Sequence, residues 1–385
     1  MRIGLDAYPL TRGIKAGISY YTHHMVRNIL DIDNKNEYFL YTPLSRKVDL
    51  SYPNLHFPPI SDANLVNKFS TSWMLFNAKR RLNKDKIDIF WGTQGIIPPN
   101  LPESVRSLVT IHDLTFYLYP RSMAFINYLI HKFLLKKSIV NAQKIIADSY
   151  ATANDLKNIF ENENIKEKTS VVYCGIDSKF KQSDKALTIE YLVPKFNISR
   201  KFILYVGTVE PRKNIVGLLK AFKILKTKYM IPHQLLLVGP KGWKTAQIIK
   251  IYRKFSFREN DVKFLGYVGE NDLVRLYGGA DLFVIPSFYE GFGMPPLEAM
   301  GCGLPVVASN IAIFREVLGE AALLVDPLNS GEIAECIYKV LSDNELKIGL
   351  VQKGFKRSKM FSWKSSAEKM LEAFDSIKPE YSRMP

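Results

Sequence analysis

The densest group of chemically useful side chains surrounds two glutamates, Glu290 and Glu298, which stand eight residues apart. The turn Gly291–Met294 lies between them, the apolar run Ala280–Ile285 before them indicates a buried strand, and a helix is expected after the turn. This order is typical of phosphate-binding sites, because backbone N–H groups at the start of a helix attract anions. Eight helical residues return to within ~80° of the same direction, so both carboxylates can face one region.

A second charged group follows another predicted strand, Phe202–Val206. The segment Gly207–Asn214 after this strand carries Arg212 and Lys213 side by side, just before a helix expected to start near Ile215. An arginine can hold two phosphate oxygens at once, and a lysine adds a point charge. This pair therefore predicts a diphosphate site, whereas the pair alone would equally suit a solvated basic turn.

Two further candidates follow predicted strands in the first half of the chain. His112 closes the strand Val105–Ile111, and ligands bind at the carboxyl ends of parallel strands. We expect His112 to contact a sugar or polarise a hydroxyl, with a hydrogen bond inside the strand–loop corner as the alternative. Gly17 follows the first strand and opens a helix that continues to Leu30, where an ordinary turn is the alternative.

Short apolar runs alternate with helical periodicity along the whole chain, which implies parallel, doubly wound sheets. The predicted strands are Ile3–Ala7, Tyr38–Thr42, Ile87–Trp91, Val105–Ile111, Lys144–Ala147, Ser170–Tyr173, Phe202–Val206, Gln234–Val238, Val262–Leu265, Leu282–Ile285, Val306–Ala308 and Leu323–Val325. The fold class is therefore α/β, with two Rossmann-like domains facing a cleft. Periodicity weakens between Asp177 and Lys201, so the domains are assigned to residues 1–185 and 195–365.

Length and composition limit the remaining choices. The 385 residues suggest two or three domains at ~150 residues each, and the net charge of +16 is spread over both halves. Such charge suits nucleic acid, an anionic membrane or a phosphorylated substrate, but no nucleic-acid-binding motif is present. The three cysteines form no spaced pair, which favours a reducing compartment without structural zinc. There is no run of ~20 apolar residues, and Asp6 interrupts any signal-like segment, so a cytoplasmic protein is expected.

Two basic and aromatic stretches, Leu65–Leu82 and Phe125–Lys137, suit an interfacial helix on a membrane. The alternative is a helix packed on its own sheet with its lysines extended into solvent. We predict peripheral attachment to an anionic membrane, on its inner face, through the first stretch. The side chains expected to make this contact are Phe69, Trp73, Phe76, Lys79, Arg80 and Arg81.

Taken together, the glutamate and Arg-Lys motifs resemble those of the GT-B glycosyltransferases. The closest resemblance is to the retaining family 4, which includes glycogen-synthase-like and mannosyltransferase-like enzymes; it covers nearly the whole chain and is most specific in residues 202–326. The resemblance implies that Arg212 and Lys213 stabilise the departing diphosphate. It further implies that Glu290 holds the sugar, Glu298 holds the ribose and His112 lines the sugar pocket.

The same resemblance supplies the remaining assignments. It implies that residues 366–385 form a helix crossing back to the N-terminal domain, which binds the acceptor. The other substrate-binding residues are Gly17, Tyr267, Val268, Phe292, Gly293 and Met294, although Ala16 and Ser19 replace two of the family's usual glycines around Gly17. No metal and no cofactor are expected, because basic residues neutralise the leaving diphosphate and the nucleotide sugar is itself a substrate.

The motif combination looks most like the mannosyltransferases that build bacterial surface polysaccharide such as O-antigen. The expected partners are a nucleotide sugar, GDP-mannose first, and a glycan or lipid-linked glycan acceptor; no nucleic acid is expected. Three alternatives remain: a UDP-glucose or UDP-N-acetylglucosamine donor, a sugar-nucleotide epimerase without acceptor, and a non-enzymatic module for anionic glycolipid. The intact set of Arg212, Lys213, Glu290 and Glu298 argues against the last.

Overall fold

The computed structural model describes residues 1–11, 17–42, 48–58, 73–74, 77–119, 125–161 and 164–379. These residues fall into two compact units. The first lies within Met1–Leu118, Ala124–Gly175 and Ser362–Pro385, and the second within Tyr119–Met123 and Ile176–Phe361. The junction therefore follows Gly175, ten residues before the predicted end of the first domain, and the chain returns to the first unit at Ser362 rather than at residue 366.

The described part of the first unit contains a seven-stranded parallel sheet in the order β3-β2-β1-β4-β5-β6-β7. Its strands are β1 (Arg2–Asp6), β2 (Glu37–Tyr41), β3 (Leu55–His56), β4 (Ile89–Gly92), β5 (Arg106–Ile111), β6 (Lys144–Ala147) and β7 (Thr169–Val171). Its helices are η1 (Tyr8–Thr11), α1 (Ile18–Ile32), α3 (Ala78–Lys84), α4 (Thr115–Leu118), α5 (Phe125–Asn141), α6 (Tyr150–Ile159), α7 (Ile165–Lys168) and α16 (Trp363–Ser376).

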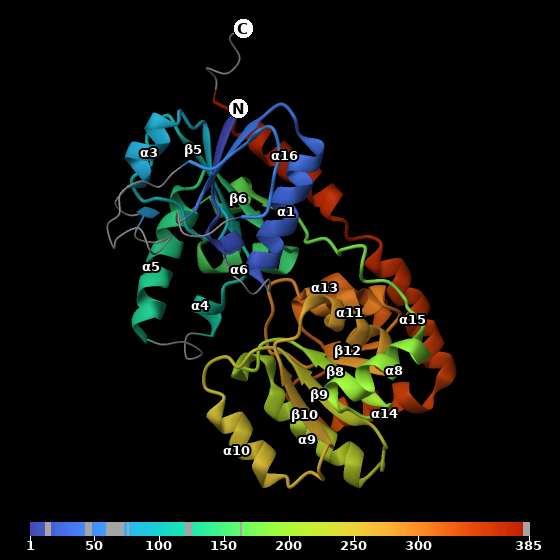
Figure 1. Ribbon diagram of the computed structural model, residues 1–385. Coiled ribbons are helices and arrows are strands. Elements are labelled where there is room, and N and C mark those ends of the chain that lie inside the picture. Colours follow the sequence, from blue (N-terminus) through green and yellow to red (C-terminus); the bar gives the residue numbers. More distant parts are fainter. Residues whose placement is uncertain are drawn as a thin grey trace. The chain divides into compact units, whose positions relative to one another are not determined.

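Helices α1 and α16 lie side by side in the first unit, although they come from opposite ends of the chain (Figure 1). The ring of Trp363 on α16 meets that of Tyr21 on α1 edge-on, with centroids 5.8 Å apart. Gly175 lets the chain pass close to the start of α16, because a Cβ atom at that position would lie 2.1 Å from the backbone nitrogen of Trp363. The last described helix thus belongs to the core of the first unit.

The prediction that Trp73 faces a membrane is wrong. Its side chain is 3% exposed, and its ring stacks on Tyr41 with centroids 4.9 Å apart, in the core cluster that also contains Phe90. An apolar sheet face must be covered, and a large aromatic ring removes much apolar area from water. Phe69 and Phe76 lie outside the described residues. Among the helices that the structure describes, none is both long enough and apolar enough to cross a membrane.

In the second unit, the described strands form a six-stranded parallel sheet in the order β10-β9-β8-β11-β12-β13. They are β8 (Phe202–Val206), β9 (Gln234–Val238), β10 (Val262–Gly266), β11 (Leu282–Ile285), β12 (Val306–Ser309) and β13 (Ala322–Val325). The helices are α8 (Lys185–Phe196), η4 (Pro211–Lys213), α9 (Ile215–Thr227), α10 (Ala246–Lys254), α11 (Glu270–Gly279), α12 (Met294–Gly301), α13 (Ala312–Leu318), η5 (Gly319–Ala321), α14 (Ser330–Ser342) and α15 (Asn344–Ser358).

The strand order of the second unit reverses between β8 and β11, which are direct neighbours. From β8 the chain winds outward to β9 and β10, and from β11 it winds the opposite way to β12 and β13. The loops that follow β8 and β11 therefore leave the same edge of the sheet and diverge, which is where doubly wound sheets bind ligands. These loops contain residues 207–214 and 286–293, the two charged segments singled out in the sequence.

The predicted fold class, two Rossmann-like α/β domains with parallel sheets, is confirmed. Each predicted strand corresponds to an observed one within two residues at either end. Strand β3 was not predicted, because its two residues are too short to give an alternating pattern.

Candidate functional site

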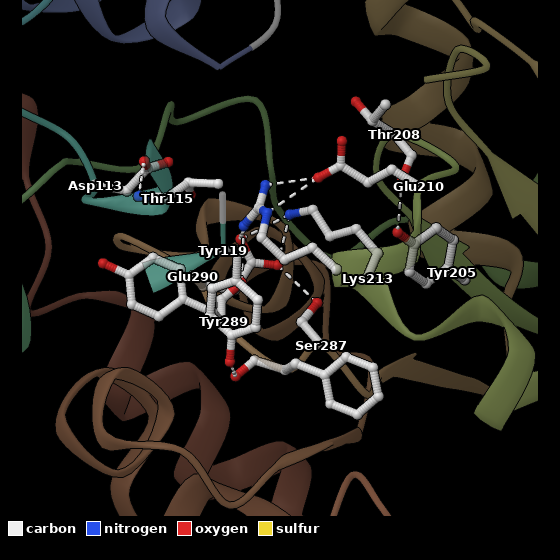
Figure 2. A network of polar contacts seen from close by, with 12 residues as sticks. Asp113, Thr115, Tyr119, Tyr205, Thr208, Glu210, Lys213, Ser287, Tyr289 and Glu290 are labelled. Atoms are coloured by element: carbon white, nitrogen blue, oxygen red, sulfur yellow. Dashed lines mark hydrogen bonds and ion pairs between the residues drawn. The ribbon is translucent and has the colours of Figure 1, made fainter. Parts of the chain in front are cut away.

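Four charged side chains from the loops after β8 and β11 meet at the reversal point of the second sheet. We call this group, which consists of Glu210, Arg212, Lys213 and Glu290, the charge cluster (Figure 2). Its two carboxylates are nearly removed from solvent, with Glu210 1% and Glu290 7% exposed. Buried charges persist only when they are paired, so this cluster is an organised polar site rather than a solvated turn.

Lys213 and Glu290 form its closest ion pair. The lysine Nζ lies 2.5 Å from Oε1 and 2.6 Å from Oε2 of Glu290, and the Ser287 hydroxyl donates to Oε1 at 2.7 Å. Burial favours a raised pKa for Glu290, but the charges of Lys213 and Arg212 outweigh it and hold this pKa below its usual range. Burial lowers the pKa of Lys213, which Glu290 offsets only in part. The pair joins residues 77 positions apart in sequence.

Arg212 links the two loops. Its Nε and Nη2 lie 3.0 and 2.8 Å from a single oxygen, Oε1 of Glu210. Its Nη1 donates to the carbonyl of Tyr289 at 2.7 Å and lies 3.4 Å from Oε2 of Glu290. The backbone N–H of Phe288 donates in return to the Arg212 carbonyl at 2.9 Å. The guanidinium thus holds the loop after β11 against the loop after β8.

The local sequence explains why the two cations stand where they do. Pro211 opens the short helix η4, and Asn214 ends it in the left-handed conformation. The Asn214 side chain then caps α9 by accepting from the Gly217 N–H at 3.1 Å, and it donates to the Pro327 carbonyl at 2.6 Å. Asparagine is among the residues that tolerate this backbone conformation and cap helices well. Arg212 and Lys213 are therefore held immediately before the positive end of α9.

The turn after Glu290 depends on Gly293, which has a φ of +81° and precedes α12. A Cβ atom there would lie 2.6 Å from a ring carbon of Phe314, so any other residue would be both strained and crowded. Pro295 and Pro296 occupy the first turn of α12 and have no N–H. The two prolines therefore leave few backbone donors at this helix end for the anion binding that the sequence predicted there.

Glu298 has a different environment from Glu290. It is buried on α12 and accepts a hydrogen bond from the Tyr277 hydroxyl at 2.8 Å, and the contacts described for it include no member of the charge cluster. Burial raises the pKa of Glu298 to about 7, although the Tyr277 hydrogen bond opposes this effect. The two glutamates of the motif therefore differ in charge state near neutral pH.

We expect Glu298→Gln to be more stable than the wild type at pH 8, and we expect this gain to be smaller at pH 5. Because the pKa of Glu298 is raised to about 7 from 4.5, its stabilising neutral form is fully present below pH 4.5 and is lost as the pH rises through 7. Glutamine stays neutral and still accepts from Tyr277, so the gain at pH 8 is about 2–3 kcal/mol. Urea unfolding at both pH values measures it, with Glu335→Gln on the exposed face of α14 as control. A gain that is equal at both pH values would contradict the expectation.

His112 lies in the first unit, where both of its ring nitrogens have partners. Nδ1 lies 2.6 Å from Oδ2 of Asp148, and Nε2 lies 2.9 Å from the carbonyl oxygen of Thr93. Burial lowers the pKa of His112, but the Asp148 charge and these bonds outweigh it and raise the pKa. A carbonyl and a carboxylate are both acceptors, so both ring nitrogens can donate when the ring is protonated, which agrees with the raised pKa. Its role in sugar binding stays a prediction that requires the Thr93 contact to open.

The remaining predicted residues occupy both units. Gly17 is the N-cap of α1 in the first unit, with a φ of +53°. In the second unit, Tyr267 and Val268 follow β10 directly, the first 49% exposed and the second buried. The residues that the structure brings into one cluster are Arg212, Lys213 and Glu290, and the turn carrying Phe292, Gly293 and Met294 follows directly. The roles assigned to all these residues stay predictions.

Sequence reasoning gave no role to Glu210 or Tyr119, although Glu210 lies in the motif that contains Arg212 and Lys213. Glu210 stands two residues before Arg212, a spacing that could have suggested the ion pair. The Tyr119 hydroxyl donates to the Phe288 carbonyl at 3.3 Å, and its ring lies 5.5 Å from that of Tyr289, so it braces the loop before Glu290 (Figure 2). No pattern signals this contact, because it joins residues 169 positions apart.

The chain is similar to glycosyltransferases in both sequence and fold. A family model described as Glycosyl transferases group 1 matches residues 193–357, which include the whole charge cluster. The O-antigen chain mannosyltransferase B of Escherichia coli is 31% identical over 287 residues, 74% of this chain and 74% of that protein. The O-antigen chain mannosyltransferase RfbU of Salmonella typhimurium is 31% identical over 228 residues, 59% of this chain and 58% of that protein. A solved sucrose-phosphate synthase from Thermosynechococcus elongatus matches with a TM-score of 0.76 and 20% identity, covering 98% of this chain and 99% of that one.

Proposed function

The chain belongs to the group 1 glycosyl transferases, and from this premise we propose that it moves mannose from GDP-mannose onto a glycan or lipid-linked glycan. The observation that carries the proposal is the meeting of Lys213, Arg212 and Glu290 at the reversal point of the second sheet. The preference for mannose rests on the O-antigen mannosyltransferases, at 31% identity.

The charge cluster suits cleavage of a sugar–diphosphate bond. Negative charge grows on the diphosphate as it departs, and cations fixed beforehand stabilise such charge most effectively. Lys213 and Arg212 are the cations, and Lys213 must exchange Glu290 for a phosphate oxygen when the donor binds. The carboxylate of Glu290 is then available to accept hydroxyls of the donor sugar, and Glu298 is available to hold the ribose.

We further propose that the anomeric configuration is retained. The bond from C1 of the sugar to the β-phosphate oxygen breaks, and the acceptor hydroxyl oxygen forms a bond to C1 from the same face. The hydroxyl proton passes to the departing diphosphate. No divalent metal is needed in this scheme, because Lys213 and Arg212 supply the positive charge that a metal would otherwise provide.

Calorimetric titration with GDP, UDP and ADP in excess chelator tests the proposal. We expect GDP to bind most tightly, and transfer from GDP-mannose to continue without added Mg²⁺ or Mn²⁺. If UDP binds most tightly, the donor is a UDP-sugar and the proposed class of reaction still stands. Sugar-nucleotide isomerisation in the absence of acceptor would identify an epimerase, and lack of binding to all three nucleotides would refute the proposal.

Peripheral attachment to an anionic membrane remains part of the proposal, without Trp73. Lys79 and Arg80 are exposed on α3, whereas Arg81 pairs with Asp85 at 2.7 Å. Each basic residue near an anionic surface contributes about 1 kcal/mol, and salt screens this attraction. Such attachment would bring a lipid-linked acceptor to the enzyme.

We expect Lys79→Glu with Arg80→Glu to release the protein from anionic vesicles at low salt, because two attractive charges become repulsive. The double change leaves the pair between Arg81 and Asp85 intact. Vesicle sedimentation measures it, and Arg253→Glu with Lys254→Glu, an exposed adjacent pair on α10, is the matched control. Unchanged binding, or equal loss in the control, would show that α3 is an ordinary packed helix.

A further inference from the structure

We propose that Glu210 is a positioning residue for the donor diphosphate. It fixes the guanidinium of Arg212 and at the same time lowers the net positive charge that the diphosphate meets. The inference rests on the proposed function, since it takes a nucleoside diphosphate as the ligand. Neither the sequence motifs nor the family description gives Glu210 a role.

The backbone around Glu210 is closely packed. Val209 before it pairs with Lys241 in an isolated β-bridge, and the Gly242 N–H donates to the Val209 carbonyl at 3.1 Å. A Cβ atom at Gly242 would lie 3.2 Å from the Glu210 Cβ, so the loop after β9 covers this residue closely. A side chain anchored in this way, with 1% of its surface exposed, is suited to orient its partner.

The contacts of Arg212 show what Glu210 contributes. Glu210 accepts a hydrogen bond from Nε and forms an ion pair with Nη2, which leaves Nη1 to the Tyr289 carbonyl and Glu290. Without Glu210, the nearest carboxylate to Arg212 would be Glu290. Arg212 would then turn toward the carboxylate that the donor sugar needs, and away from the diphosphate.

The charge balance gives Glu210 a second effect of opposite sign. With all four groups ionised, the two cations and two carboxylates of the charge cluster sum to zero. The charges that face Glu210 are those of Arg212, Lys213 and Glu290, and burial raises the pKa of Glu210 against the lowering effect of both cations. The negative charge of Glu210 therefore weakens the attraction of the cluster for a diphosphate. The fixed orientation of Arg212 offsets this loss of affinity.

The positioning effect and the charge effect of Glu210 can be separated, because the hydrogen bond from Nε and the ion-pair contact of Nη2 both involve one oxygen, Oε1. Glu210→Gln keeps an acceptor oxygen at that position and removes the charge, whereas Glu210→Ala removes both. We expect Glu210→Gln to bind GDP about tenfold more tightly than the wild type, and Glu210→Ala to bind it about tenfold more weakly. Calorimetric titration of the full chain with GDP measures both.

A matched control distinguishes the effect of the charge at Glu210 from the effect of the protein's net charge on GDP binding. Glu320→Gln makes the same change of net charge at an exposed residue that precedes β13, and so lies at the sheet edge opposite the site. Its GDP affinity should equal that of the wild type. Melting curves show whether each variant is folded. Weak GDP binding by a Glu210→Ala variant that melts like the wild type supports a positioning role and excludes collapse of the loop.

The outcomes distinguish this inference from the proposed function. If the wild type binds neither GDP nor another nucleoside diphosphate, the proposed function fails. If the wild type binds and both Glu210 variants change affinity in the same direction, or neither changes it, the role of Glu210 is overturned while the proposed function stands.

Discussion

Glu290→Gln is expected to slow sugar transfer by roughly 10²–10³ while leaving GDP binding at least as tight as in the wild type. The carboxylate is needed only when it accepts hydroxyls of the donor sugar, and loss of one such interaction at a reacting centre costs roughly 10²–10³ in rate. In the free protein the same carboxylate holds Lys213 at 2.5 Å, so neutralising it releases that ammonium for the diphosphate. Turnover with GDP-mannose and calorimetry with GDP measure the two effects.

Glu298→Ala is the matched comparison, since it changes the other glutamate of the motif. It should weaken GDP binding, because Glu298 is assigned to the ribose and has no described contact with the charge cluster. Equal loss of nucleotide affinity in the Glu290 and Glu298 variants would refute this division of roles.

Lys213→Ala and Arg212→Ala are each expected to weaken GDP binding by about 10- to 100-fold. The reason is the loss of a charge-assisted bond to phosphate, worth about 1.5–3 kcal/mol. Lys213→Ala should also destabilise the fold, on the order of 3 kcal/mol, because it removes the closest partner of a buried carboxylate. Calorimetry and urea unfolding measure the two effects separately.

The double variant Lys213→Met with Glu290→Gln controls for the stability effect. It removes both charges of the pair and should recover most of the lost stability, yet bind GDP as weakly as Lys213→Ala. If both single alanine variants bind GDP like the wild type, the diphosphate site lies elsewhere. If the double variant regains affinity as well, Lys213 acts only by balancing Glu290.

The two charged loops could be located from the sequence because each follows a strand that is recognisable as an apolar run. Strands β8 and β11 are continuous apolar runs, and loops after parallel strands leave the same sheet edge. To predict that the two loops touch, one must also know that the strand order reverses between β8 and β11, and no local sequence pattern encodes this order. The pairing of Lys213 with Glu290 in the free protein was therefore not predicted.

Trp73 shows where sequence reasoning failed. A basic and aromatic helix has the same pattern whether its apolar face covers a sheet or enters a membrane, and only tertiary packing distinguishes the two. In this protein the sheet needed a cover, and Trp73 stacks on Tyr41. The contact of Tyr119 with the loop before Glu290 was equally hidden, since it depends on a long-range approach of the chain.

The most direct test of the central claim is proton NMR of GDP-mannose turnover in excess chelator, with the wild type and Glu290→Gln side by side. We expect the wild type to release GDP together with sugar that is first observed in the α configuration of the donor, and we expect Glu290→Gln to bind GDP but to consume the donor at least about 100-fold more slowly. Sugar first observed in the β configuration would contradict retention. Equal turnover by the two proteins would contradict the assignment of the site to the charge cluster.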